Sequence, residues 1–415
     1  MKYPIIRDKT LDFADQGYAD LYPNLHKYPA TMLPQIGVAL LKRLGITCGT
    51  LLDPYCGSGS SFAAALDVGI TEMFGFDLNP LAILITQAKF TKIAPAALDE
   101  AQQKLREAVF EFVKKEKNLN HLELPKITNI DYWFSPVVAQ NLNVLKYFID
   151  QIEDQKIKNF FLVPYAETIR ECSYTRNNEF KLYRIKPAEI LSFNPDVFSA
   201  FFKKLTDSIQ IYADYYFPKI QEDTRLELRQ VPFSAEVSPR QTFDVVLTSP
   251  PYGDSRTTVA YGQFSTLANE WLGVNEARKL DNALMGGKRV KRLYNRGVLE
   301  KRISQIAQID EKRALDVSAF YFDLQDSIAQ IAPRINPGGK VIYLVGNRTV
   351  KGAQLPTDQF IAEQFEQYGF KHQITYERAL SSKVMPSQNS PSNQKGAKVN
   401  TMLFEYVIIC EKKYS

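Results

Sequence analysis

The alternation of apolar and polar stretches predicts a sheet domain near the start of the chain. A short apolar run at 49–55 indicates a buried strand, and a Gly/Ser turn and a small-residue helix at 62–69 follow it. A second apolar run at 72–79 and a helix at 80–90 repeat this order. A strand, a glycine turn, a helix, a strand and a helix in succession are typical of a parallel sheet.

The sheet pattern returns late in the chain, after a stretch of different character. This stretch contains no glycine and includes amphipathic segments such as 97–117, so we expect it to be a mostly helical insertion. The later strands are expected within 243–254, 339–347, 372–380 and 401–412. The pattern therefore divides the chain into a first half of a sheet domain, a helical insertion and a second half, at 1–94, 95–235 and 236–415.

Composition excludes several classes of protein. The 415 residues include 51 Lys or Arg and 46 Asp or Glu, and 45% are hydrophobic, which does not fit a disordered, collagen-like or coiled-coil chain. The sequence has no apolar run long enough for a bilayer span and no signal-peptide core, so we expect a cytoplasmic protein without a membrane partner. Its four cysteines form no Cys-x-x-Cys pair, so we expect neither a metal site nor a disulfide framework.

The first candidate site is the glycine turn in the segment DPYCGSGS, at 53–60. Two glycines between a strand and a helix let the backbone approach a ligand closely. A dinucleotide-binding fingerprint would need a small residue where Phe62 stands, so the motif does not favour a nicotinamide enzyme. Asp77 ends the next predicted strand and can accept hydrogen bonds from both hydroxyls of a ribose. An ordinary strand–helix turn and a helix-capping role for Asp77 are the alternatives.

The second candidate site is the segment TSPPY, at 248–252. Its two prolines lack backbone N–H donors and stiffen the chain, so they hold the Ser249 hydroxyl and the Pro250 carbonyl as acceptors with a fixed direction. Tyr252 adds a flat ring. Such a site suits a planar group that bears an NH2, because the acceptors take its hydrogens and the ring stacks on its face. A rigid Pro-Pro turn is the alternative.

Together, DPYCGSGS and SPPY resemble the amino-methylating DNA methyltransferases that use S-adenosylmethionine. The SPPY form is most similar to the enzymes that act on cytosine N4, whereas adenine N6 enzymes more often carry Asp or Asn where Ser249 stands. The resemblance implies an α/β fold: a Rossmann-like methyltransferase sheet, mostly parallel, with an antiparallel terminal hairpin. It covers 26–90 and 240–412, and the helical insertion has no counterpart in it.

The resemblance also implies a set of site residues. The segment HKYPATM, at 26–32, resembles the part of the family that completes the cofactor pocket. The predicted cofactor-binding residues are His26, Tyr28, Pro29, Met32, Asp53, Pro54, Tyr55, Cys56, Gly57, Gly59, Asp77, Leu78 and Asn79. The predicted catalytic residues are Ser249, Pro250, Pro251 and Tyr252. The segment 226–237 has no clear Asp for the adenine amino group of the cofactor, so that contact is unassigned.

A base inside a duplex must be flipped out before it can react, and this requires compensating contacts to the DNA backbone. The segment 286–302 carries seven basic residues against one acidic residue, so it is the candidate DNA surface, with a solvated helix face as the alternative. The whole of 254–315 is the candidate target-recognition segment, and the helical insertion is a second possible DNA-contacting region. The predicted DNA-binding residues are Arg256, Tyr261, Lys288, Arg289, Lys291, Arg292 and Arg296.

These observations predict a site-specific enzyme that methylates cytosine N4 in double-stranded DNA by direct attack of a flipped-out base. Its expected genetic partner is a cognate restriction endonuclease. Methylation at cytosine C5 is not expected, because that chemistry uses a Cys that follows a Pro, and no Cys here does. The alternatives are an adenine-N6 DNA methyltransferase, an RNA amino-methyltransferase and a non-catalytic nucleic-acid-binding module.

Overall fold

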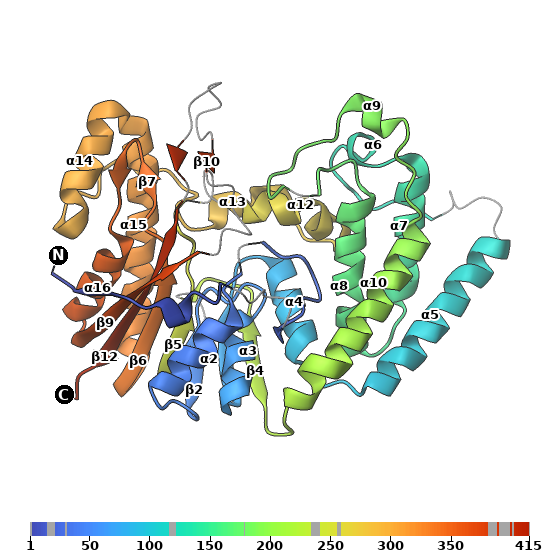
Figure 1. Cartoon of the computed structure of the whole chain (residues 1–415). Coiled ribbons are helices and arrows are strands. Elements are labelled where there is room, and N and C mark those ends of the chain that lie inside the picture. Colours follow the sequence, from blue (N-terminus) through green and yellow to red (C-terminus); the bar gives the residue numbers. More distant parts are fainter. Residues whose placement is uncertain are drawn as a thin grey trace.

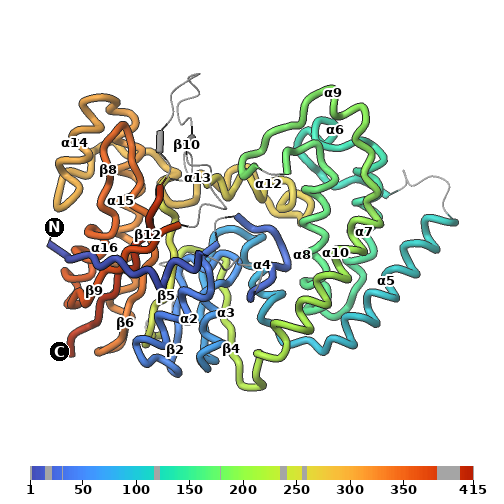
Figure 2. The backbone as a smooth tube through the Cα atoms, in the orientation of Figure 1, coloured from blue at the N-terminus to red at the C-terminus, as the bar shows by residue number. Residues whose placement is uncertain are grey.

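The computed structural model places a sheet domain beside a helical lobe (Figure 1). The two labelled chain ends lie on the same side of the molecule, away from the helical lobe (Figure 2). The structure describes residues 2–14, 21–29, 31–115, 122–177, 179–233, 241–254, 259–380 and 402–414, and the backbone of 388–389 and 399–400.

The described residues form an eight-stranded sheet that is mostly parallel. β2 pairs in parallel with β3 and β5, β3 with β4, and β5 with β6, whereas β12 runs antiparallel between β6 and β9. The strand order reverses between β2 and β5. From edge to edge the strands are β1 (Ile5–Arg7), β9 (Phe370–Ala379), β12 (Phe404–Lys412), β6 (Ile335–Val345), β5 (Phe243–Thr248), β2 (Thr50–Asp53), β3 (Glu72–Phe76) and β4 (Arg225–Arg229).

Helices cover both faces of this sheet and form two apolar cores with it (Figure 1). One face packs against α2 (Pro34–Arg43), α3 (Ser60–Val68) and α4 (Pro80–Phe90). The other face packs against α15 (Glu311–Ile331) and α16 (Thr357–Gln367), and α14 (Glu300–Ile309) packs against α15. The three-layer arrangement explains why the central strands are continuous apolar runs, since both of their faces are buried. In the described part of the chain, no helix combines the length and apolar character that a bilayer crossing requires.

The helical lobe contacts the sheet domain where its helix α8 packs against α4. Its helices are α5 (Pro95–Lys115), α6 (Ile130–Trp133), α7 (Pro136–Asp150), α8 (Gln155–Cys172), α9 (Pro187–Ile190) and α10 (Val197–Ile211). One side chain joins its two ends: the Tyr212 hydroxyl donates to the Thr91 carbonyl (2.7 Å) and accepts from the Ile93 N–H (2.9 Å). The lobe therefore leaves and re-enters the sheet domain at one point. α12 (Tyr261–Trp271) and α13 (Leu280–Ala283) lie between the lobe and α14 (Figure 1).

The structure confirms the predicted fold class, with its parallel core and antiparallel β9–β12–β6 end. It corrects the predicted boundary at 235. β4 lies inside the segment assigned to the insertion, yet it is the edge strand of the sheet and pairs with β3. Its sequence, RLELR, alternates between charged and apolar residues, because one strand edge and the charged side chains face solvent. The insertion therefore ends before Arg225.

Candidate active site

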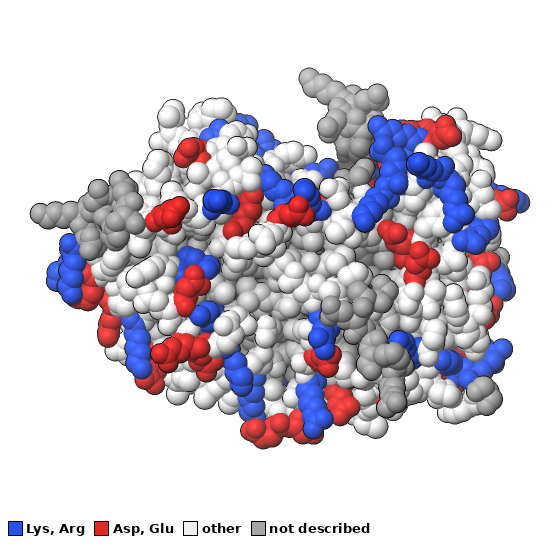
Figure 3. Space-filling model, turned by 180° about the vertical axis from the view of Figure 1, so that it is seen from behind, with Lys and Arg blue, Asp and Glu red and all other residues white. Residues whose placement is uncertain are grey.

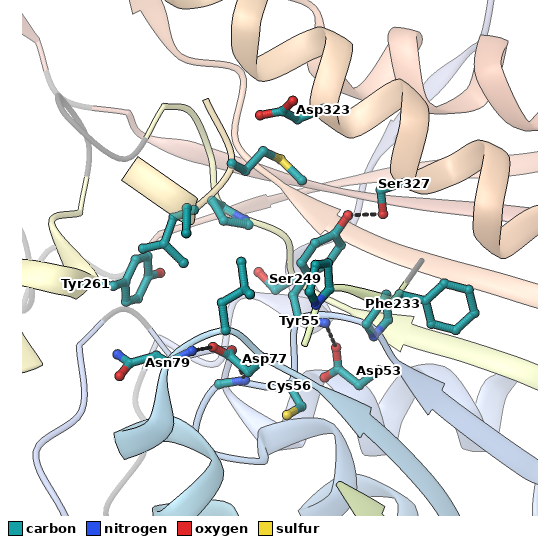
Figure 4. A pocket seen from close by; sticks show the side chains of 18 of the residues that line it. Asp53, Tyr55, Cys56, Asp77, Asn79, Phe233, Ser249, Tyr261, Asp323 and Ser327 are labelled. Carbon is teal, nitrogen blue, oxygen red and sulfur yellow. Dashed lines mark hydrogen bonds between the residues drawn. The ribbon is translucent and has the colours of Figure 1, made fainter. Parts of the chain in front are cut away.

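A cavity of about 580 Å³ lies at the carboxyl ends of β2, β3 and β5, next to the point where the strand order reverses (Figure 4). Ligands in open α/β sheets bind at this position. Its wall includes every predicted cofactor residue except His26 and Gly59, together with two residues of the SPPY segment: Tyr28, Pro29, Met32, Asp53, Pro54, Tyr55, Cys56, Gly57, Asp77, Leu78, Asn79, Ser249 and Pro251. The glycine turn and the SPPY segment thus share one cavity.

Asp77 is fixed by the backbone of the turn beneath the cavity. Its two carboxylate oxygens accept hydrogen bonds from the Gly57 N–H (3.0 Å) and the Asn79 N–H (2.8 Å). Gly57 has a φ of +50°, which favours glycine and directs its N–H toward the carboxylate. Burial raises the pKa of Asp77 to about 6. At pH above that value, both oxygens keep lone pairs for the hydroxyls of a ligand.

Asp53 links the glycine turn to the strand that carries the SPPY segment. Its carboxylate accepts from the Thr248 hydroxyl (2.6 Å), the Ser61 hydroxyl (2.5 Å) and the Tyr55 N–H (3.0 Å). Burial raises the pKa of Asp53 to about 6. Because Thr248 directly precedes Ser249, this carboxylate sets the position of Ser249 relative to the turn.

The two glycines of the turn have different surroundings. Gly57 lines the cavity, whereas Gly59 is the N-cap of α3 and faces α4. A Cβ at Gly59 would lie 2.5 Å from the Phe90 ring, so its close approach is to a helix rather than to a ligand. The bulky Phe62 is accommodated because Gly75 stands opposite on β3, where a Cβ would lie 2.7 Å from the ring. Gly59, which was predicted to bind the cofactor, therefore lies behind the described wall and faces α4.

Two tyrosines and one asparagine form the wall beside α12. The rings of Tyr28 and Tyr261 stack with centroids 5.9 Å apart. The Asn79 amide donates to the Tyr28 hydroxyl (3.0 Å) and to the Ser265 hydroxyl (3.1 Å), which ties both rings to the end of β3. Tyr261, which was predicted to contact DNA, therefore lies in the cavity wall. It faces Phe233 across the cavity (Figure 4).

The residues of the SPPY segment divide between the cavity and the protein behind it. Ser249 and Pro251 line the cavity. Pro250 is buried, and the half-buried Tyr252 is absent from the described wall. The Tyr252 hydroxyl accepts from Ser249 Oγ (3.3 Å) and donates to the Glu405 carboxylate on β12 (2.8 Å). The aromatic rings in the described wall are those of Tyr28, Tyr55, Phe233 and Tyr261.

Some residues of the cavity wall were not predicted from the sequence. Val231, Pro232 and Phe233 follow β4 and make an apolar side. α15 contributes Ser327, which hydrogen-bonds to the Tyr55 hydroxyl, and Asp323, which accepts from the Gly286 N–H (2.8 Å) (Figure 4). Burial raises the pKa of Asp323. None of these residues lies in a motif, and they reach the cavity only through tertiary packing.

His26 does not line the cavity. It is 2% exposed, and its ring meets the Phe264 ring edge-on, with the ring centroids 6.1 Å apart. Neither ring nitrogen has a hydrogen-bond partner among the described residues. Burial lowers its pKa to about 4, so the ring is neutral at physiological pH. The structure therefore places His26 behind Tyr28, as part of the packing that supports the wall.

Similarity to known proteins agrees with this geometry. No family model matches the chain. The type II methyltransferase M.MvaI from Kocuria varians is 36% identical over 431 residues, which cover 97% of this chain and 93% of that protein. The chain belongs to the type II methyltransferases. A second type II methyltransferase, M.MjaII from Methanocaldococcus jannaschii, is 21% identical over 314 residues, or 55% of this chain and 58% of that protein. Among solved structures, TrmN from Thermus thermophilus matches with a TM-score of 0.28 and 10% sequence identity. The match covers 93% of this chain and 51% of the TrmN chain.

The methyl donor of this type II methyltransferase is S-adenosylmethionine. The cavity fits that molecule on three observations. Asp77 presents free lone pairs for ribose hydroxyls, and Val231 and Phe233 offer an apolar wall for a base. The buried Ser58 hydroxyl, which lines the cavity, has no hydrogen-bond partner in the part of the chain that the structure describes. When bound, the donor supplies an electrophilic methyl group.

The predicted DNA-binding residues of the basic segment are exposed in this type II methyltransferase, and one end of the segment reaches the cavity. Lys288 lines the cavity, and the other four residues project from the surface near α15: Arg289, Lys291, Arg292 and Arg296. Arg289 pairs with Asp316 (3.0 Å), and Arg292 lies over the Phe322 ring at 4.8 Å. Lys and Arg side chains, drawn in blue, gather on this side of the molecule, at the upper right of Figure 3. Arg256 lies outside the described residues.

Proposed function

We propose that this type II methyltransferase transfers a methyl group from S-adenosylmethionine to cytosine N4 in double-stranded DNA, as the modification partner of a restriction endonuclease. The observation that carries the proposal is the shared cavity: Ser249, an acceptor, faces the same space as Gly57 and Asp77. An acceptor beside the methyl donor suits an amino group. The serine in SPPY favours cytosine N4 over adenine N6.

The chemistry asked of the chain is mostly positioning. The exocyclic nitrogen of cytosine is a poor nucleophile, because its lone pair is delocalised into the ring. By accepting one N–H, Ser249 favours a more tetrahedral nitrogen whose lone pair points at the methyl group. The new N–C bond forms as the S–C bond breaks, and the nitrogen then loses one proton to solvent. Orientation and local electrostatics supply most of the rate, and no covalent enzyme intermediate is needed.

The cavity is recessed between α12, α13 and α15, so a base must leave the duplex to reach Ser249. We propose that phosphate contacts by Arg289, Lys291, Arg292 and Arg296 offset part of the unstacking cost, which is about a few kcal/mol. Lys288 lies where these contacts meet the cavity. These contacts to the DNA backbone position the duplex and do not read its bases.

The helical lobe offers a second basic surface for the same duplex. Arg176 and Lys186 are exposed, and Arg184 lies over the Tyr132 ring at 4.2 Å. Arg170 is different: it is buried, stacks on Phe264 at 4.3 Å and donates to its carbonyl, so it holds the lobe to α12. We propose that the exposed residues, and not Arg170, contact DNA.

The test is incubation with S-adenosylmethionine labelled on the methyl group and unmethylated plasmid DNA, followed by nucleoside analysis. We expect label in N4-methylcytosine, and Ser249→Ala serves as the matched control because it removes only the acceptor. Label in N6-methyladenine would overturn the choice of base and support the adenine enzyme. Label in RNA, with none in DNA, would overturn the proposed substrate.

A further inference from the structure

A chain of hydrogen bonds runs away from the cavity behind Ser249. Ser249 Oγ is 3.3 Å from the Tyr252 hydroxyl, and that hydroxyl is 2.8 Å from Glu405 Oε1. The other Glu405 oxygen forms an ion pair with Arg378 of β9. The side chains of Arg378 and Glu405 are 3% and 12% exposed, so the chain ends in a nearly buried pair. Glu405 is 153 residues from Tyr252 and belongs to no motif.

Arg378 is itself fixed by backbone groups from the start of the chain. Its Nε donates to the Leu11 carbonyl (2.7 Å), and a terminal nitrogen donates to the Asp12 carbonyl (3.1 Å). A guanidinium held at these two nitrogens directs its third nitrogen at Glu405. The carboxylate position is thereby set by β9, β12 and the segment after β1 together.

The direction of the hydrogen bonds follows from the end group. An ionised carboxylate has only acceptors, so the Tyr252 O–H must donate to Glu405. The tyrosine oxygen is then left to accept, and the Ser249 O–H donates to it. The Ser249 oxygen consequently presents only lone pairs to the cavity. Without this chain, the serine hydroxyl can rotate and place its own hydrogen in the cavity, where it opposes an incoming N–H.

We propose that Glu405 is a positioning residue that acts through Tyr252 to make Ser249 an obligate hydrogen-bond acceptor toward the amino group of the target base. This role rests on the proposed function for the acceptor role of Ser249, and it holds for either amino-bearing base. The Tyr252 hydroxyl is therefore held by protein groups on both sides. The proposed role also assigns a function to the terminal antiparallel strands, which lie beside β6 and contribute no described residue to the cavity wall.

The test is a double-mutant cycle with Glu405→Gln and Tyr252→Phe. Glutamine keeps the shape of the side chain but can donate to the tyrosine oxygen, which reverses the chain. We expect Glu405→Gln to lower kcat by about 10- to 100-fold, while the Kd for S-adenosylmethionine stays within about twofold. In the Tyr252→Phe background, the same change should have almost no further effect, because the connection to Ser249 is already cut. Equal losses in both backgrounds would mean that Glu405 acts only through its ion pair, and would overturn the proposal.

A second measurement does not depend on activity. Burial and the Glu405 charge raise the pKa of Tyr252 well above its usual value. In protein labelled at tyrosine Cζ, the Tyr252 resonance is assigned by its loss in Tyr252→Phe and is then titrated. We expect Glu405→Gln to lower the titration midpoint, and an unchanged midpoint would overturn the hydrogen-bond chain. If the wild-type enzyme methylates no nucleic acid, the proposed function fails, whereas this titration still decides the role of Glu405.

Discussion

Replacing Gly57 and Gly59 of the cavity turn one at a time, with Gly45 outside the turn as a control, separates the cost of backbone strain from the cost of close packing. Gly45, Gly57 and Gly59 all have a positive φ, at +68°, +50° and +84°. Alanine at any of them therefore carries the cost of the left-handed conformation, about 1 kcal/mol. A Cβ at Gly45 meets no described atom within 4 Å, and one at Gly57 comes no closer than 3.9 Å, to Tyr28. At Gly59 the same atom would lie 2.5 Å from Phe90 and 3.1 Å from Thr86.

We therefore expect Gly45→Ala and Gly57→Ala each to lower the free energy of unfolding by about 1 kcal/mol, and Gly59→Ala to lower it by about 2 to 4 kcal/mol, since overpacking adds about 1 to 3 kcal/mol. Urea denaturation followed by circular dichroism measures these differences. Isothermal titration should also show weaker S-adenosylmethionine binding for Gly57→Ala, whose methyl group stands at the cavity wall. If Gly59→Ala is no less stable than Gly45→Ala, the packing argument for Gly59 is refuted.

Three further predictions concern ligand binding and turnover. Asp77→Ala should raise the Kd for S-adenosylmethionine, whereas Ser249→Ala should lower kcat and leave that Kd unchanged; equal losses of cofactor affinity would contradict the division of roles. Because burial raises the pKa of Asp77 to about 6, cofactor affinity should fall as the pH drops below that value and the carboxylate is protonated, and titrations in Asp77→Asn should lose this step. Charge reversal of Arg289 and Arg292 should weaken DNA binding and flatten its salt dependence, whereas Lys104→Glu, on the exposed face of α5, should change neither.

The sheet and the heart of the cavity could be predicted from the sequence, because both depend on local signals. Buried parallel strands appear as apolar runs, and Pro80 and Gly69 mark helix ends where the structure has them. The turn at 53–60 and the SPPY segment follow two adjacent strands, β2 and β5. Residues at the carboxyl ends of such strands meet at one edge of the sheet.

The parts that could not be predicted depend on contacts between distant segments. β4 resembles a polar segment because it is an edge strand, so its residues did not separate from the helical insertion. Ser327 and Asp323 reach the cavity only because α15 packs across the sheet. A positive φ at Gly59 was foreseeable, but its neighbour Phe90 was not. The partner of Tyr252 likewise could not be found, since Glu405 lies on another strand and stands in no motif.

The bond that Tyr212 makes to both Thr91 and Ile93 has a consequence for how this enzyme can diversify. The chain enters and leaves the helical lobe side by side, so the sheet domain before and after the lobe stays continuous. The lengths of the lobe's outer helices can therefore change without altering the strands that position Asp53 and Asp77.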